Sequence, residues 1–392
     1  MNSFLVAIFI SETIVCAVID CFVEIKGISA ILMLFLLFIN FFVNSVIRFT
    51  RLKKGILTVL LLEGILLLSG LLNGFSYVQS YAAYFCVFGF TALMLSFNDI
   101  DYKFVLSVIV IIYSIYNMLY FMTIRSQFLT SEDYYGQSMG IAYAETISIY
   151  ILLLIIFYQN TFKLSHGITF LCIVNSLVSI FIIVIDCHSR GSVGCIMIAG
   201  IVYFLSRKKG IKKNMYLIVI VSAAMVAIYN FQSIIMAISR FLNQNGVTLG
   251  FIDKFIFLYK SGIGVGNGRE LYYDKAWEAV RSSPLVGHGV GYFEKMVNGA
   301  YVHNIFLDLL VDFGIIGTLI ALYLIFYVPM DHMLRERSKL STGFVLFLLC
   351  SGELMLNFSS SFWLSPLFWY MFFFYLQMPK ERGHYRIKIR RK

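Results

Sequence analysis

Charged side chains are scarce in this sequence. Asp, Glu, Lys and Arg make up 13% of its 392 residues, whereas soluble globular proteins have about 25%. Apolar residues make up 60% of the chain. This composition excludes a soluble enzyme and a disordered chain, and it supplies enough apolar residues for about twelve membrane spans of roughly 20 residues each. We therefore expect an all-α polytopic membrane protein with a single membrane domain over residues 1–392.

Metal and disulfide patterns are also lacking. The seven cysteines form no C-x-x-C pair and lie in or at the ends of apolar stretches, so neither a zinc site nor a disulfide framework is indicated. Lys and Arg outnumber Asp and Glu by 31 to 21. In a soluble protein this excess would suggest nucleic acid as partner, but in a membrane protein it reflects topology. We expect no metal, no cofactor and no nucleic acid.

Apolar runs separated by polar residues predict twelve spans. They cover residues 3–23, 28–47, 55–72, 77–97, 104–124, 140–159, 167–187, 191–206, 214–238, 304–329, 344–361 and 364–378. The first run lacks a basic n-region and a cleavage site, so we expect it to be retained as a span. Lys and Arg are concentrated on one side of these spans, which predicts cytoplasmic termini and a basic cytoplasmic tail over 379–392. No strong internal repeat is visible.

The longest polar interruption is the segment 240–302, which this topology places outside the cytoplasm between spans 9 and 10. A loop of this length is usually functional. Asn267 and Glu270 have the spacing of a capping box and predict a helix that ends near Ser282. Its expected apolar stripe comprises Tyr273, Ala276, Trp277 and Val280. Arg269 lies in its first turn, where an anion is favoured, although its spacing alone favours a solvated loop cation that pairs with a nearby carboxylate.

Glycines flank this helix on both sides. The run from Gly262 to Gly268 matches no phosphate-binding motif and is expected to be a hinge. The run from Pro284 to Gly291 contains His288, and His303 follows at the start of the tenth span. Three polar residues then recur every four positions on one face of that span: Asn304, Asp308 and Asp312. A carboxylate stripe in a span must face protein or water. His303 beside it is suited to proton transfer, although a histidine at a helix start is often only a surface residue.

A second cation of interest is Arg190, in a short turn between two spans. Lipid exposure of its guanidinium would be unfavourable. Asp186 lies four residues before it, so a local ion pair between the two is one interpretation. The other is that Arg190 and Arg269 together clamp an anion such as pyrophosphate.

Together these elements resemble the O-antigen polymerase and ligase superfamily, which includes the Wzy-type polymerases. The resemblance is specific from about residue 185 to 325. It rests on Ser189-Arg190-Gly191, Arg269, Trp277, the glycine run from Pro284 to Gly291, His303-Asn304, and Asp312-Phe313-Gly314 with Gly317. Asp312 stands where the family usually has Glu.

The resemblance implies an extracytoplasmic glycosyltransferase whose donor is a polyprenyl-pyrophosphate-linked oligosaccharide. It gives Arg190 and Arg269 the role of pyrophosphate-binding residues and His303 that of the base on the acceptor hydroxyl. It also implies substrate contacts by the surrounding polar and aromatic residues, which are Trp277, Arg281, His288, Asn304, Asp308 and Asp312. Expected partners are the lipid bilayer and the chain-length regulator and flippase of the same pathway. The expected location is the cytoplasmic membrane of a bacterium.

Several alternatives remain open at this stage. Polymerase and ligase chemistry share a donor and differ only in the acceptor. Glu132 and Asp133 form an acidic pair that could hold a divalent metal ion, whereas Asp99 and Asp101 are better explained as a helix-end pair. A lipid-linked oligosaccharide flippase would be expected to show internal repeats and a midplane site. A membrane scaffold would tolerate replacement of both arginines and of His303.

Overall fold

The computed structural model describes residues 1–23, 27–43, 49–130, 134–207, 215–216, 219–220, 222, 230–246, 252, 256–257, 269–335 and 339–377. These residues form helices and connecting turns without a strand. Short π-helical or 3-10 turns extend several of the helices, namely η1 (Phe85–Gly89), η2 (Tyr120–Ile124), η3 (Ile182–Asp186), η4 (Tyr323–Tyr327), η5 (Leu354–Asn357) and η6 (Phe362–Leu364). The all-helical expectation is confirmed for this part of the chain.

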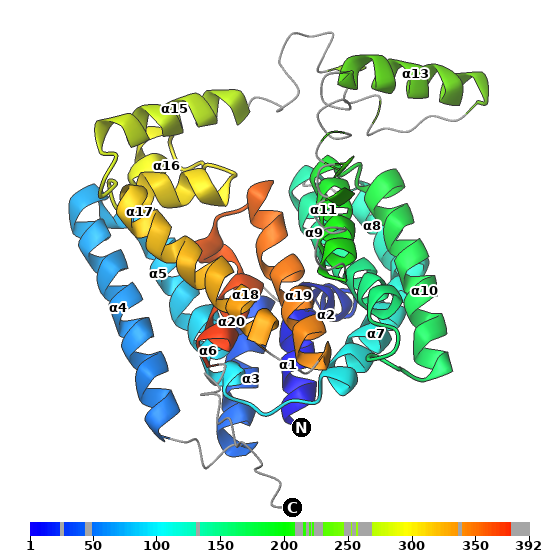
Figure 1. Cartoon of the computed structure of the whole chain (residues 1–392), viewed down its shortest axis with the longest axis horizontal. Coiled ribbons are helices and arrows are strands. Elements are labelled where there is room, and N and C mark those ends of the chain that lie inside the picture. Colours follow the sequence, from blue (N-terminus) through cyan, green and yellow to red (C-terminus); the bar gives the residue numbers. More distant parts are fainter. Residues whose placement is uncertain are drawn as a thin grey trace, which may run out of the picture.

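The described residues contain eighteen α-helices. In order they are α1 (Asn2–Ile10), α2 (Glu12–Asp20), α3 (Ile28–Val43), α4 (Phe49–Asn73), α5 (Phe75–Tyr84), α6 (Phe90–Ser96), α7 (Tyr102–Leu119), α8 (Arg125–Thr130), α9 (Tyr134–Phe157), α10 (His166–Phe181), α11 (Arg190–Ser206), α13 (Phe231–Gln244), α15 (Arg269–Ser282), α16 (Tyr292–Met296), α17 (Ile305–Leu322), α18 (Val328–Arg335), α19 (Lys339–Glu353) and α20 (Pro366–Gln377). Figure 1 shows α15 lying across one end of the bundle beside α16, with the N-terminus at the opposite end.

Seven stretches of helix in the described part are long and apolar enough to cross a membrane. They are 55–73, 75–96, 102–129, 138–157, 166–186, 305–331 and 340–357. Two shorter apolar helices, α3 and α11, accompany them. The chain is therefore a multi-pass membrane protein. Twelve spans are not confirmed, and residues 214, 217–218, 221 and 223–229 of the predicted span 214–238 lie outside the described residues.

Two predicted spans differ from continuous crossing helices. The segment 3–23 bends by 77° between α1 and α2, because the backbone of Ser11 leaves the helical region (φ −97°, ψ 16°). The segment 364–378 contains α20, which has 12 residues. At 1.5 Å per residue such a helix is about 18 Å long, short of the roughly 30 Å hydrocarbon layer. Neither segment crosses a membrane as one straight helix.

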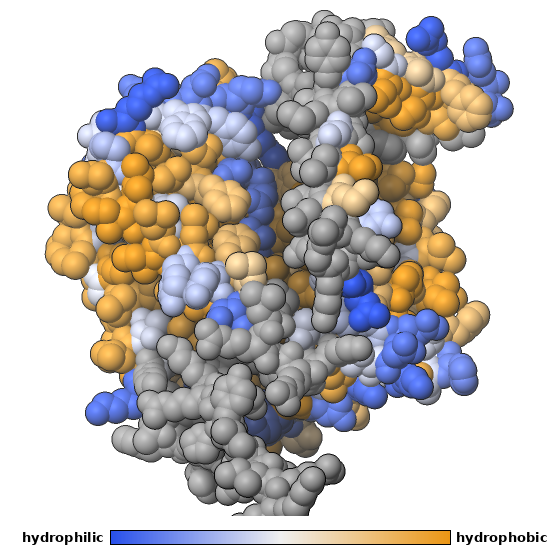
Figure 2. All heavy atoms as spheres, viewed as in Figure 1, coloured by the Kyte–Doolittle hydropathy of each residue, from blue (hydrophilic) through white to orange (hydrophobic). Residues whose placement is uncertain are grey.

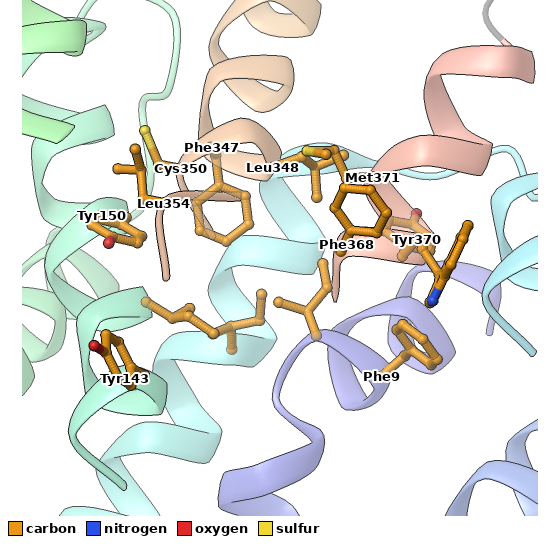
Figure 3. Packing of buried hydrophobic residues seen from close by; sticks show 14 of the residues in the cluster. Phe9, Tyr143, Tyr150, Phe347, Leu348, Cys350, Leu354, Phe368, Tyr370 and Met371 are labelled. Carbon is orange, nitrogen blue, oxygen red and sulfur yellow. The ribbon is translucent and has the colours of Figure 1, made fainter. Parts of the chain in front are cut away.

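Apolar side chains fill the inside of the bundle and also cover its surface. Figure 3 shows part of the interior, where Phe347 and Leu348 of α19 pack near Phe368 of α20. Figure 2 shows broad apolar areas on the outside, with hydrophilic side chains between and at the ends of them. Exposed residues of this kind include Leu71 and Leu72 of α4, which are 71% and 74% exposed. A soluble protein rarely exposes so much contiguous apolar surface, so these faces contact lipid.

Candidate functional site

Three segments that are distant in sequence bring two arginines and a histidine together. Arg190 is the first residue of α11, Arg269 is the first residue of α15, and His303 lies two residues before α17. The charge of Arg269 acts on Arg190 and also on His303. All three side chains are partly buried. The structure thus gathers the three residues that the sequence analysis singled out for chemistry.

Arg190 is held by the way α11 begins. Ser189 caps the helix, and its hydroxyl accepts a hydrogen bond from the Ser192 N–H at 3.4 Å. His188 just before it adopts a positive φ of 50°, which turns the chain sharply out of η3. Arg190 therefore stands in the first turn of a capped helix, where free N–H groups and the helix dipole favour a bound anion.

Asp186, which one interpretation pairs with Arg190, has a different arginine as a partner. Asp186 instead receives a two-pronged interaction from Arg125, whose Nε lies 2.8 Å from Oδ2 and whose Nη2 lies 2.9 Å from Oδ1. The Tyr120 hydroxyl donates to the same Oδ2 at 3.0 Å. Asp186 ends a π-helical turn, and its carboxylate is directed towards the start of α8. This network fixes the turn that leads to Arg190, on which the charges of Arg269 and Glu270 act.

Arg269 is anchored to the opposite wall of the site. Its Nη1 donates a hydrogen bond to the Phe358 carbonyl oxygen, in the turn that follows η5. The same Phe358 side chain packs beside Gly191 and Gly194 of α11. One guanidinium has five N–H donors, so a single backbone contact positions Arg269 and leaves further donors for a ligand.

His303 is a neutral imidazole in a crowded setting. Its ring lies 4.2 Å from that of Tyr301 and 6.1 Å from that of Tyr272, measured between centroids. Burial and, second, the charge of Arg269 lower its pKa from the usual 6.5 to about 4. Its Nδ1 is buried without a hydrogen-bond partner in the described part of the chain. The ring is therefore in the form that accepts a proton at neutral pH.

The glycine run Pro284–Gly291, called the strap below, is joined to α17 through backbone hydrogen bonds. The N–H groups of His288 and Gly289 donate to the carbonyls of Val311 (2.8 Å) and Asp312 (2.9 Å). In return, the N–H groups of Ile315 and Ile316 donate to the carbonyls of Pro284 (2.8 Å) and Leu285 (3.1 Å). The strap therefore replaces helical hydrogen bonds that α17 lacks at this level.

The break in α17 is centred on Gly314. Its backbone (φ 62°, ψ −169°) is not helical, and it lies in a region that only glycine readily adopts. A Cβ at Gly287 would lie 2.5 Å from the Asp312 carbonyl carbon and oxygen. Both glycines are needed because two backbones meet here. The predicted span 304–329 is therefore helical but interrupted, and the sequence motif from Asp312 to Gly314 has a structural explanation.

The strap is also fixed to α4. The Asn73 side-chain amide donates to the carbonyls of His288 (3.0 Å) and Val290 (3.1 Å). The Val290 N–H donates to the Ser69 hydroxyl at 3.0 Å. The strap thus bridges α4 and α17 at the end of the bundle where α15 lies.

The polar stripe of α17 faces protein. Asn304 caps the helix, and its Oδ1 accepts from the N–H groups of Phe306 and Leu307, both at 3.1 Å. Asp308 is buried and accepts from the Ser361 hydroxyl at 2.9 Å, and Asp312 is buried as well. The charge of Glu294 of α16 acts on both aspartates, and that of Asp308 acts on Asp312.

Glu294 is a buried residue that the sequence analysis missed. The Tyr81 hydroxyl donates to it at 2.6 Å, and burial raises its pKa. It follows the strap by three positions, and this proximity was the only sequence signal. Across the described residues, no group of three or more His, Cys, Asp or Glu side chains is arranged to hold a metal ion.

Trp277 and Arg281 of α15 lie apart from the two arginines. Trp277 is 45% exposed. The buried stripe of α15 is Ala276, Ala279 and Val280, so the expected stripe was wrong in including Trp277, which lies about 100° around the helix from Ala276. Arg281 is exposed, about 18 Å along the helix from Arg269 at 1.5 Å per residue.

His288 belongs to the strap. Its Nε2 lies 2.8 Å from the Ser282 hydroxyl and 3.0 Å from the Ala279 carbonyl oxygen. Its ring stacks on Tyr292 with centroids 3.9 Å apart. These contacts tie the end of α15 to the strap.

Other predictions can be placed only in part. The hinge at 262–268, the acidic pair Glu132 and Asp133, and the tail 379–392 lie outside the described residues. Asp101 is placed, and its carboxylate caps α7 by accepting from the Lys103 N–H at 2.9 Å. This confirms its interpretation as a helix-end residue.

A comparison with protein families supports this grouping of residues. Residues 175–322 match the model of a family described as O-Antigen ligase. The matched segment includes Arg190, Arg269 and His303, the strap, and α17 as far as its last residue. No curated protein matches the chain.

Proposed function

We propose that the chain polymerises lipid-linked oligosaccharides. The proposal starts from the match of residues 175–322 to the O-antigen polymerase and ligase superfamily. Membership of this superfamily makes it a membrane enzyme of the glycosyltransferase type that acts on a lipid-linked glycan. The proposal adds that the donor is a polyprenyl-pyrophosphate-linked repeat unit and that the acceptor is another such unit. The product would be a capsule, an exopolysaccharide or an O-antigen chain at a bacterial cytoplasmic membrane.

The observation that carries the proposal is the convergence of Arg190, Arg269 and His303. The charges of Arg269 and Glu270 both act on Arg190, and pyrophosphate, which carries more negative charge than one carboxylate, would lie between the two guanidinium groups. Arginine suits this role because its planar fork binds two phosphate oxygens at once. As the sugar C1–O bond to pyrophosphate breaks, negative charge grows on the leaving group, and fixed arginines stabilise it in the transition state.

His303 completes the reaction. The acceptor hydroxyl attacks C1 from the face opposite the leaving pyrophosphate, and its proton passes to the neutral imidazole. The new glycosidic bond then has the inverted anomeric configuration, and the polyprenyl pyrophosphate departs with the bonding electron pair. No step requires a metal. A product linkage with retained configuration would contradict this mechanism.

Donor binding also tunes the base. In the donor-free site, burial and, second, the charge of Arg269 hold the pKa of His303 near 4, which makes the imidazole a weak proton acceptor. A bound pyrophosphate brings negative charge beside the same arginine. It opposes the smaller of the two effects, that of Arg269, and so raises the pKa of His303 above its donor-free value, which makes the imidazole a better general base. The base is therefore strengthened when the donor is in place.

The test is reconstitution of the purified protein in proteoliposomes with the lipid-linked repeat unit of its own host. Products are then separated by size. A ladder of chain lengths without added acceptor supports a polymerase. A single transfer that appears only when a foreign lipid acceptor is added indicates a ligase. Absence of any new glycosidic bond, with folded protein, would contradict the proposal and favour a transporter or scaffold.

A further inference from the structure

Tyr143 of α9 reaches the point where Arg190 and Arg269 meet. A Cβ built on Gly191 would overlap the Tyr143 hydroxyl oxygen, and the tyrosine Cζ would lie 3.1 Å from it. The hydroxyl therefore occupies the space that a side chain at Gly191 would fill. The charge of Arg269 acts on Tyr143, and Tyr301 and Tyr273 are near enough to interact with it as well.

Among the described residues no hydrogen bond involves the Tyr143 hydroxyl, and it is not one of the fully enclosed hydroxyls without a partner, which are those of Tyr116, Tyr203 and Tyr370. Other buried tyrosines do have partners. Tyr113 donates to the Ala144 carbonyl at 2.6 Å and Tyr120 donates to Asp186 at 3.0 Å. The Tyr143 side chain is 7% exposed, so a hydroxyl group largely removed from water gains free energy from a ligand that accepts its hydrogen bond. Figure 3 shows its oxygen on the side of the ring away from the apolar residues Phe347 and Phe9.

We propose that Tyr143 is a third ligand of the donor pyrophosphate. Its O–H donates a hydrogen bond to a phosphate oxygen held between Arg190 and Arg269, so it binds substrate without taking part in proton transfer. The inference rests on the proposed function. It also gives Gly191 a reason, because a larger residue there would displace the hydroxyl.

The experiment measures binding of farnesyl pyrophosphate to the purified full-length protein in detergent by titration calorimetry. A hydrogen bond to a charged group contributes about 1.5–3 kcal/mol, so Tyr143→Phe should raise the dissociation constant about tenfold or more. The matched control is Tyr113→Phe, in which another buried tyrosine of the same bundle loses a hydroxyl. It should lower the melting temperature and leave the dissociation constant within about twofold of wild type.

A second pair of variants separates a binding role from a packing role. Gly191→Ala should weaken farnesyl pyrophosphate binding because its methyl group displaces the Tyr143 hydroxyl. In a Tyr143→Phe background the same change should cost little more, since the overlapping atom is gone. Changes in binding free energy that are not additive in this way indicate direct coupling between Gly191 and Tyr143. If the effects of the two changes simply add, the hydroxyl is not what Gly191 accommodates.

The outcomes distinguish this inference from the proposed function. If Tyr143→Phe binds farnesyl pyrophosphate as wild type does while Arg190→Ala binds it much more weakly, the role of Tyr143 is overturned and the proposed function stands. If neither wild type nor any variant binds the probe, both are overturned.

Discussion

Replacing Gly314 with alanine should separate the strap from α17. The added Cβ would lie 2.5 Å from the Leu285 carbonyl oxygen and 2.5 Å from the Val286 nitrogen. These are backbone atoms and cannot rotate away. The replacement also places a side chain on a residue with φ 62° and ψ −169°, a conformation that costs a non-glycine residue about 1–3 kcal/mol.

The magnitude follows from the contacts at risk. Four backbone hydrogen bonds join the strap to α17, and each contributes about 0.5–1.5 kcal/mol net. Together with the backbone cost, complete separation would destabilise the protein by about 3–9 kcal/mol. Unpaired backbone groups are especially costly at membrane depth. A loss of this size is comparable to the whole stability of a typical domain.

The assay is thermal unfolding of the purified protein in detergent, together with glycan transfer. Gly200→Ala in α11 is the control, because nothing lies within 4 Å of its added Cβ. Alanine is also favoured over glycine within a helix by about 0.8–1 kcal/mol. We expect Gly314→Ala to unfold at a much lower temperature and to lose transfer, and Gly200→Ala to match or exceed wild type. If the two variants unfold at the same temperature, the strap does not stabilise the break in α17.

Three further predictions concern the arginines and His303. Arg190→Lys should lose glycan transfer almost as completely as Arg190→Ala, because the point charge of lysine does not replace the planar guanidinium, which binds two phosphate oxygens. As a control, Arg207→Lys at the other end of α11 should keep wild-type rates. Substantial transfer by Arg190→Lys would rule out the role of Arg190 in binding pyrophosphate. Because the pKa of His303 is about 4 in the free protein, kcat/KM should fall only as the pH drops through about 4, while kcat should fall at a higher pH since bound pyrophosphate favours the protonated ring. Two acid limbs that coincide near 6.5 would contradict this reasoning. Asp186→Asn should lower the melting temperature and slow glycan transfer, since it weakens the paired hydrogen bonds from Arg125. The free energy of unfolding should fall by about 2 kcal/mol. Unchanged stability and rate would show that this network does not position Arg190.

Local patterns in the sequence predicted much of the fold. The helix expected to end near Ser282 is present as α15, because capping and amphipathic spacing are encoded within a few residues. Seven candidate spans in the described part follow from hydropathy in the same way. The break at Gly314 was not predicted, since a glycine within an apolar run does not reveal that another segment supplies hydrogen bonds there.

The site was predictable only where its residues belong to recognisable motifs. Arg190, Arg269 and His303 were identified in this way, and the structure brings them together. Tyr143 and Glu294 could not be identified, because their importance depends on contacts between segments far apart in the chain. The Tyr81 hydroxyl bonded to Glu294, for example, belongs to a helix 213 positions earlier in the sequence.

The most direct test of the account is the ladder assay with His303→Ala beside His166→Ala. His166 begins α10 and is exposed, so its replacement controls for loss of a histidine. The account predicts that His303→Ala lowers the rate of chain extension by about 10²–10⁴-fold, the usual contribution of a general base, while farnesyl pyrophosphate binding and the His166→Ala ladder remain close to wild type. A full ladder from His303→Ala would contradict the central claim that this histidine activates the acceptor.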